Sequence, residues 1–143
     1  MRQTLLATSA LALAAGGAAA QEMSFNRIAS FATALNNGDL SGETSSSEII
    51  TVTEDGNTLI YSDSPLGAIG RIDITDPANP QPLGIIGLDG EPTAVSALGG
   101  TVFVGINTSE SYTDPSGHLA HYVVETGELA ADCDLGGQPD STA

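Results

Sequence analysis

Acidic side chains recur near the start of similar segments of this chain. Glu48 and Glu91 each stand at the start of a run of β-prone residues, and Asp140 lies near a third such start. Hard divalent cations such as calcium bind several oxygen ligands, which carboxylates supply. If the segments meet around a common axis, the sequence predicts a calcium site at Glu48, Glu91 and Asp140. The alternative is that these carboxylates accept hydrogen bonds from turn amides of a neighbouring segment.

A second candidate site is a polar loop, residues 107–116, which interrupts the similarity between two segments. It contains Glu110, Tyr112 and Asp114 together with several hydroxyl groups. Long loops on a rigid scaffold often carry binding function. We therefore expect Glu110, Tyr112 and Asp114 to contact a ligand, and the alternative is a solvated loop without function.

The histidines and the cysteine carry weaker signals. His118 and His121 lie in a predicted strand, where residues three apart point to opposite faces, so they are not expected to share a metal. His121 aligns with Arg71, which indicates a polar, outward position. Cys133 is the only cysteine, so it forms no disulfide within the chain, and we interpret it as a buried structural thiol. No catalytic motif is present, and the sequence leaves the catalytic residues unknown.

These residues lie on an internal repeat. Four pairs of segments align: 47–52 with 90–95, 55–61 with 98–104, 67–74 with 117–124, and 88–92 with 135–139. The first pair places Glu48 over Glu91. The repeat predicts a first unit at residues 47–89 and a second at residues 90–136. Residues 137–143 are then the start of a third.

Each unit contains four short β-prone runs separated by turn residues. In the first unit the connectors are rich in Gly, Pro, Asp and Asn, and the runs are 48–53, 58–62, 68–75 and 81–88. Four strands in roughly 40–50 residues are typical of a β-propeller blade. We predict an all-β fold with two four-stranded antiparallel blades of an incomplete β-propeller. The competing fold is a β-sandwich, which does not require the units to be alike.

The N-terminal residues predict export. A basic Arg2, an apolar run and three alanines before Gln21 are typical of a cleaved signal peptide at residues 1–20. We expect a periplasmic or extracellular protein, and an uncleaved membrane anchor is the alternative.

A leader, residues 21–46, precedes the repeat. We interpret residues 25–31 as a strand that closes a ring of blades and residues 36–47 as a flexible polar loop. A propeller contains about 4–8 blades. We therefore expect the third blade, begun at residues 137–143, to be truncated.

The charge of the chain restricts its partners. It carries 18 Asp and Glu against three Lys and Arg, with a formal net charge of −15. Such a surface repels phosphate backbones and anionic lipid headgroups. We therefore expect no nucleic-acid partner and no membrane insertion after signal cleavage.

Residues 71–80, with the turn Asp-Pro-Ala-Asn-Pro, resemble the repeat of secreted bacterial β-propellers with LVIVD-type repeats. Residues 47–50 and the run Gly-Gly-Gln-Pro-Asp-Ser at 136–141 are similar to a narrower group. That group comprises exported propellers described as esterase-like activity of phytase, alkaline-phosphatase-like or choice-of-anchor proteins. The resemblance covers about residues 25–141, which are the first two or three blades of a longer architecture.

The resemblance implies a parent protein that hydrolyses small-molecule phosphoesters, and it assigns no catalytic residue. Together with the calcium site predicted at Glu48, Glu91 and Asp140, it leads us to expect a calcium-dependent hydrolase. Because most blades are missing, we expect the chain alone to be inactive. One alternative is a non-catalytic surface or periplasmic propeller that binds carbohydrate, protein or metal. The other is a gene fragment without a function of its own.

Overall fold

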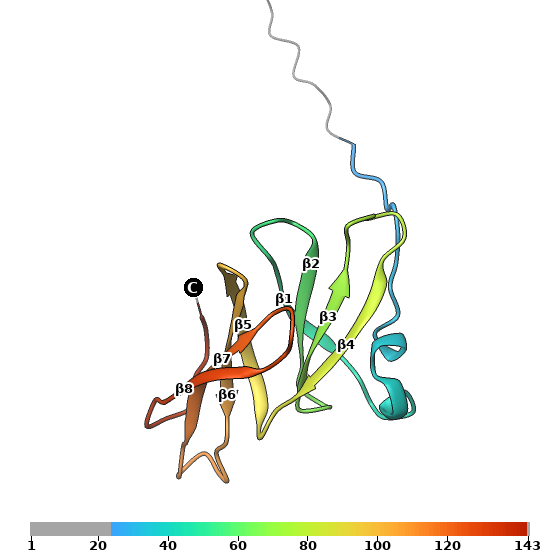
Figure 1. The fold of residues 1–143 in the computed structure, drawn as a ribbon. Helices are drawn as coiled ribbons and strands as arrows, with labels where there is room; N and C mark the ends of the chain where they lie inside the picture. The colour runs from blue at the N-terminus through green and yellow to red at the C-terminus, as the bar shows by residue number, and fades with distance from the viewer. Residues whose placement is uncertain (1–23, 143) are drawn as a thin grey trace, which may run out of the picture.

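The computed structural model describes residues 24–142, and these residues form two four-stranded antiparallel sheets (Figure 1). Sheet A consists of β1 (Ser47–Val52), β2 (Thr58–Asp63), β3 (Ala68–Asp73) and β4 (Gln81–Gly87), in that order. Sheet B consists of β5 (Glu91–Leu98), β6 (Thr101–Asn107), β7 (Gly117–Val123) and β8 (Leu129–Asp134), also in order. Two short 3-10 helices precede sheet A, η1 (Thr33–Asn36) and η2 (Gly38–Leu40).

This architecture confirms the predicted all-β fold of two four-stranded antiparallel sheets. The four predicted runs of the first unit differ from β1–β4 by no more than two residues at either end. Local turn chemistry explains the agreement, because Gly56 and Gly67 take positive φ values of 72° and 56° in the two hairpin turns of β2. The predicted signal peptide, residues 1–20, lies outside the described residues. Within residues 24–142 no helix is long and apolar enough to span a membrane.

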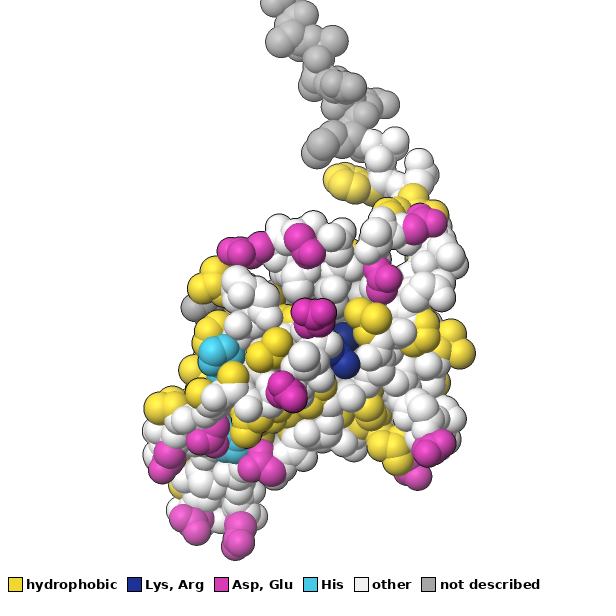
Figure 2. Space-filling view, viewed as in Figure 1, with side chains coloured by type: hydrophobic (Ala, Val, Ile, Leu, Met, Phe, Trp, Pro, Cys, Tyr) yellow, Lys and Arg dark blue, Asp and Glu magenta, His cyan; other side chains and the backbone are white. Residues whose placement is uncertain are grey.

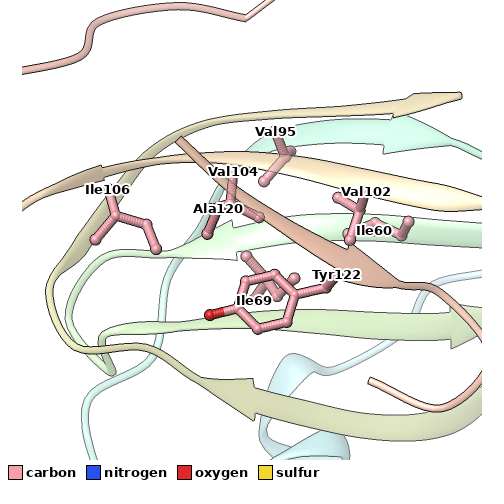
Figure 3. Close-up of a cluster of buried hydrophobic side chains, with 8 residues drawn as sticks. All are labelled: Ile60, Ile69, Val95, Val102, Val104, Ile106, Ala120 and Tyr122. Atoms are coloured by element: carbon pink, nitrogen blue, oxygen red, sulfur yellow. The ribbon is translucent and has the colours of Figure 1, made fainter. Parts of the chain in front are cut away.

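The sheets pack against each other through one apolar core, with β5 lying against β1 and β2. The buried side chains come from alternate positions of both sheets, and Figure 3 shows Ile60, Ile69, Val95, Val102, Val104, Ile106, Ala120 and Tyr122. Each of these side chains is at most 8% exposed. Burying one large aliphatic side chain contributes about 1.5–3 kcal/mol, so this core is the main source of stability between the sheets.

The opposite face of sheet A, which points away from sheet B, is organised around Tyr61. Its ring lies across Gly70, the residue directly opposite on β3, where a Cβ atom would overlap the ring. The Tyr61 hydroxyl accepts a hydrogen bond from Asn36 Nδ2 at 3.1 Å. Asn36 also donates to the carbonyl of Gly84 at 3.1 Å and accepts from its N–H at 2.7 Å. These hydrogen bonds therefore hold the leader against the outer face of sheet A.

The leader differs from its sequence-based expectation. Residues 25–31 form no strand, so the expected ring-closing strand is absent from the described residues. Residues 36–47, expected to be a flexible loop, contain a 3-10 turn and two buried asparagines, and Ser45 and Ser46 both donate to the buried carboxylate of Asp63. The physical reason is that side-chain hydrogen bonds, rather than a strand ladder, hold this segment.

Strand pairing corrects the repeat alignment at the first strand of each sheet. Ile50 pairs with Tyr61, and Val95 pairs with Val104, the residue aligned with Tyr61. Ile50, not Val52, therefore corresponds to Val95, and Glu91 is out of register with Glu48 by two residues. The cause is the hairpin turn, because four residues, 54–57, follow the backbone hydrogen bond from Thr53 to Thr58, whereas only two glycines connect β5 to β6.

Replacing Gly70 by alanine should destabilise the protein. The new methyl group overlaps the Tyr61 ring, and overpacking of a core costs about 1–3 kcal/mol. Urea unfolding followed by circular dichroism measures the loss. Gly87→Ala is the matched control, since no atom lies within 4 Å of the position that its methyl group would take, and its stability should not change. Equal stability of the two variants would contradict this account of the Tyr61 face.

Candidate functional site

The three carboxylates predicted to bind calcium do not converge in a group of ligands. Glu48 Oε2 accepts a hydrogen bond from Ser64 Oγ at 3.0 Å, and Glu91 Oε2 accepts one from Asn107 Nδ2 at 3.4 Å. Asp140 is exposed in the segment after β8. Among residues 24–142 there is no group of three or more His, Cys, Asp or Glu that could hold a metal ion. Glu48 and Glu91 instead support the ends of their own sheets.

The predicted ligand loop is an exposed extension of the β6–β7 hairpin. Glu110, Tyr112 and Asp114 are all exposed, and the Tyr112 side chain is fully so. The loop is held by its own hydrogen bonds, in which Ser109 Oγ donates to the carbonyl of Ser116 and accepts from its N–H. The loop is thus preformed, and its three candidate residues face solvent.

The two histidines point to opposite faces of β7, as expected for residues three apart on a strand. His118 Nε2 lies 3.3 Å from Asp89 Oδ1 and 4.0 Å from Asp132 Oδ2. His121 stacks on Phe103, with ring centroids 4.9 Å apart. His118 therefore ties sheet B to the segment between the two sheets.

Cys133 is exposed, which corrects its interpretation as a buried thiol. It lies on β8, the edge strand of sheet B, whose six residues are all exposed. The interpretation rested on residue type alone, because free cysteine is among the most often buried residues, but no described element covers this strand.

A cleft of about 610 Å³ opens between the two sheets, at the end where the β1–β2 and β5–β6 hairpins lie. Its wall combines one cation, three carboxylates, two threonines and apolar groups, and the lining residues include Thr53, Glu54, Asp55, Thr58, Arg71 and Glu125. Figure 2 shows one face of the molecule, with acidic side chains scattered over it around apolar groups and a basic side chain. The volume falls within the range of small-molecule sites, which is about 300–1,000 Å³.

Arg71 joins the two sheets at this cleft. One terminal nitrogen, Nη1, donates to the carbonyls of Val124 at 2.6 Å and Glu125 at 3.2 Å, and the other, Nη2, donates to the carbonyl of Leu83 at 3.1 Å. Burial lowers the pKa of Arg71, and no carboxylate of residues 24–142 lies within ion-pair distance of it. The sequence-based expectation of an outward position is wrong, since Arg71 faces sheet B.

Asp55 is the most constrained carboxylate of the cleft. The hydroxyl of Thr53 donates to its Oδ1 at 2.6 Å, and the backbone N–H of Asn57 donates to the same oxygen at 3.0 Å. The Thr53 hydrogen bond, followed by that from Asn57, lowers the pKa of Asp55, because both stabilise the ionised form. Asp55 therefore stays negatively charged at the rim, where Glu54 and Glu125 add further carboxylates.

Sequence reasoning missed this cleft because no motif marks it. Its residues come from elements that are distant in sequence, namely the β1–β2, β5–β6 and β7–β8 turns and the strands β2, β3, β4 and β7. The available signal was the isolated Arg71 in a β-prone run of an acidic chain.

No family model and no curated protein matches this chain. Among solved structures, the chain is similar to a functionally unknown protein from Desulfotomaculum acetoxidans DSM 771, with a TM-score of 0.49 and 22% sequence identity. The alignment covers 66% of this chain and 29% of that protein, so the chain spans less than a third of its length.

Replacing Arg71 by alanine should weaken the contact between the sheets. The substitution leaves three backbone carbonyls without their charged donor, and hydrogen bonds to charged groups contribute roughly 1.5–3 kcal/mol. Urea unfolding should therefore show a loss of about 2 kcal/mol. Arg27→Ala, at an exposed leader position, should leave stability unchanged, and an equal loss in both variants would contradict the inter-sheet role.

Proposed function

We propose that sheets A and B are consecutive blades of an exported β-propeller, and that the protein binds a small hydroxyl-rich ligand in the cleft between them without transforming it. Carbohydrate is the ligand class that this lining suits. Export rests on the predicted signal peptide. The acidic surface argues for a neutral or cationic ligand rather than a polyanion.

The backbone leaves both sheets through the same hydrogen bond, and this supports the blade arrangement. After β4, Leu88 donates its N–H to the carbonyl of Gly67 at 2.8 Å, and after β8 Leu135 donates to the carbonyl of Gly117 at 3.0 Å. Gly67 and Gly117 are aligned in the repeat, as are Leu88 and Leu135. The same exit geometry in both sheets is what consecutive repeating units require.

The observation that carries the binding proposal is the chemistry of the cleft wall. Carboxylates of Glu54 and Glu125 accept hydrogen bonds, whereas the hydroxyl of Thr58 can also donate. Sugar hydroxyls donate and accept, so a mixed wall of this kind recognises them. The apolar side chain of Leu83 offers a surface to the ring carbons of a sugar.

Titration with a panel of neutral sugars, followed by NMR, tests this proposal. Chemical-shift changes should cluster at the β1–β2 turn, Arg71 and the β7–β8 turn. Glu125→Gln should weaken binding, because the amide replaces one acceptor oxygen by a donor. Glu128→Gln is the matched control, since Glu128 lies in the same turn but outside the cleft lining, and its affinity should equal that of the wild type. Shifts spread evenly over the surface would contradict a site in the cleft.

The phosphoester hydrolase implied by the resemblance is a second proposal. The feature that favours it is Arg71, a guanidinium without an ion-pair partner among the described residues, at a cleft large enough for a small phosphoester.

Phosphate release from phytate and from nitrophenyl phosphate, with and without calcium, tests the hydrolase. The sugar-binding proposal predicts that no phosphate is released, because the cleft then holds its ligand without transforming it. Turnover that requires calcium and is lost in Glu48→Gln or Glu91→Gln would overturn this expectation and assign the calcium site. Turnover insensitive to both variants would argue against metal binding at these carboxylates.

A further inference from the structure

Both faces of each sheet carry apolar side chains, and the repeat shows which face of sheet A corresponds to which face of sheet B. The face of sheet B that packs on sheet A carries Val95, Ala97, Val102, Val104 and Tyr122. The corresponding residues of sheet A lie on its outer face, away from sheet B, and they are Ile50, Val52, Leu59, Tyr61 and Ile72. The outer face of sheet A therefore has the same pattern as a surface that packs on a neighbouring sheet in this structure.

The outer face of sheet B corresponds in the same way to the face of sheet A that packs on sheet B. Its residues Phe103, Leu119, Cys133 and Leu135 correspond to Ile60, Ile69, Ile86 and Leu88, which pack in the core between the sheets. In sheet B these positions are half-buried or exposed, and Leu135 is 50% exposed. The outer face of sheet B thus matches the surface that receives a neighbour in sheet A.

The leader covers only part of the outer face of sheet A. Residues 28–31 lie beside Leu59 and Ile72 around a cleft of about 240 Å³, so this contact is loosely packed. On β1 the apolar side chains of Ile50 and Val52 remain 56% and 45% exposed. Figure 1 shows the leader, in blue, descending beside β4 to η1, on the side of sheet A distant from sheet B.

We propose that the leader is a releasable cap, and that the outer face of sheet A, once uncapped, docks the outer face of sheet B of a second copy of this chain. The new interface repeats the one between sheets A and B, except at Gly105 and Gly117, where Pro139 of the same chain already packs and must be displaced by β1 of the second copy. Such a head-to-tail contact is heterologous, so it forms a ring if the rotation closes and a filament if it does not. A ring of about 4–8 blades would contain about two to four copies.

Apart from Ser45 and Ser46 at the junction with β1, Asn36 makes all the hydrogen bonds between the leader and sheet A among the described residues. Its amide makes three hydrogen bonds to sheet A, to Tyr61 Oη and to both backbone groups of Gly84. Neither polar side-chain atom of the adjacent Asn37, which is equally buried, has a hydrogen-bond partner within residues 24–142. Losing the Asn36 amide would leave buried polar groups unsatisfied in the capped state, and this favours release of the leader.

Charge sets the conditions for the measurement. The formal net charge of −15 opposes association of two copies, and salt screens this repulsion beyond a Debye length of about 3 Å at 1 M. Sedimentation velocity of the purified chain is therefore run at low and at high salt. The wild type should remain monomeric in both.

Asn36→Ala should associate in a concentration-dependent way, more strongly at high salt, with the average mass at least doubled. Asn37→Ala, the matched control, should stay monomeric because it removes no hydrogen bond. Adding Phe103→Glu to Asn36→Ala should restore the monomer by placing a charge in the docking face of sheet B. Tyr112→Glu in the same background adds an equal charge on the exposed loop and should leave association intact.

If Asn36→Ala loses its β-sheet circular dichroism, Tyr61→Phe replaces it, since it removes one of the three hydrogen bonds and keeps the ring. A folded, monomeric Asn36→Ala or Tyr61→Phe at high salt would overturn the proposal, and so would association that persists with Phe103→Glu. The proposal rests on the blade arrangement of the proposed function but not on its ligand. If the chain binds sugar but never associates, only the cap proposal is refuted. If it associates but binds no sugar, only the sugar-binding proposal is refuted.

Discussion

The contact between the two sheets is the constraint on which the rest of the structure depends. A strand alternates its side chains, so a sheet that is apolar on both faces must be covered on both. Sheet A meets this requirement with Ile60 and Ile69 toward sheet B and with Tyr61 toward the leader. Arg71 adds polar attachment at the border of the core, where its donors reach carbonyls of both sheets.

The leader shows how a segment without a β-strand can cover part of a sheet. A single amide side chain makes hydrogen bonds with both backbone groups of Gly84 and with the hydroxyl of Tyr61. Asp63, fully buried, collects hydrogen bonds from Ser45 and Ser46 and so fixes the place where the leader turns into β1. These contacts are polar and join residues 17 to 48 positions apart in the sequence, and they order the segment without a hydrophobic core of its own.

Much of the fold could be predicted from the sequence because it is encoded locally. Hairpin turns with Gly, Asp and Asn define the strand boundaries, and the repeat distinguishes two similar sheets. The leader could not be predicted, because Asn36 acts on residues nearly fifty positions away and resembles any polar loop residue. The first-strand register was misassigned because sequence similarity at Glu48 and Glu91 is weaker evidence than the lengths of the turns. The cleft was missed for the same reason as the leader, since distant turns build it.

The unequal hairpins have a consequence for how repeated sheets acquire different chemistry. The longer β1–β2 turn carries Glu54 and Asp55 to the mouth of the cleft, whereas its counterpart in sheet B is a pair of glycines without side chains. A neighbour stacked on sheet B would meet a junction without that acidic rim. An insertion of two residues in one turn is thus enough to make one junction of a repetitive scaffold unique, while the strands that hold it stay interchangeable.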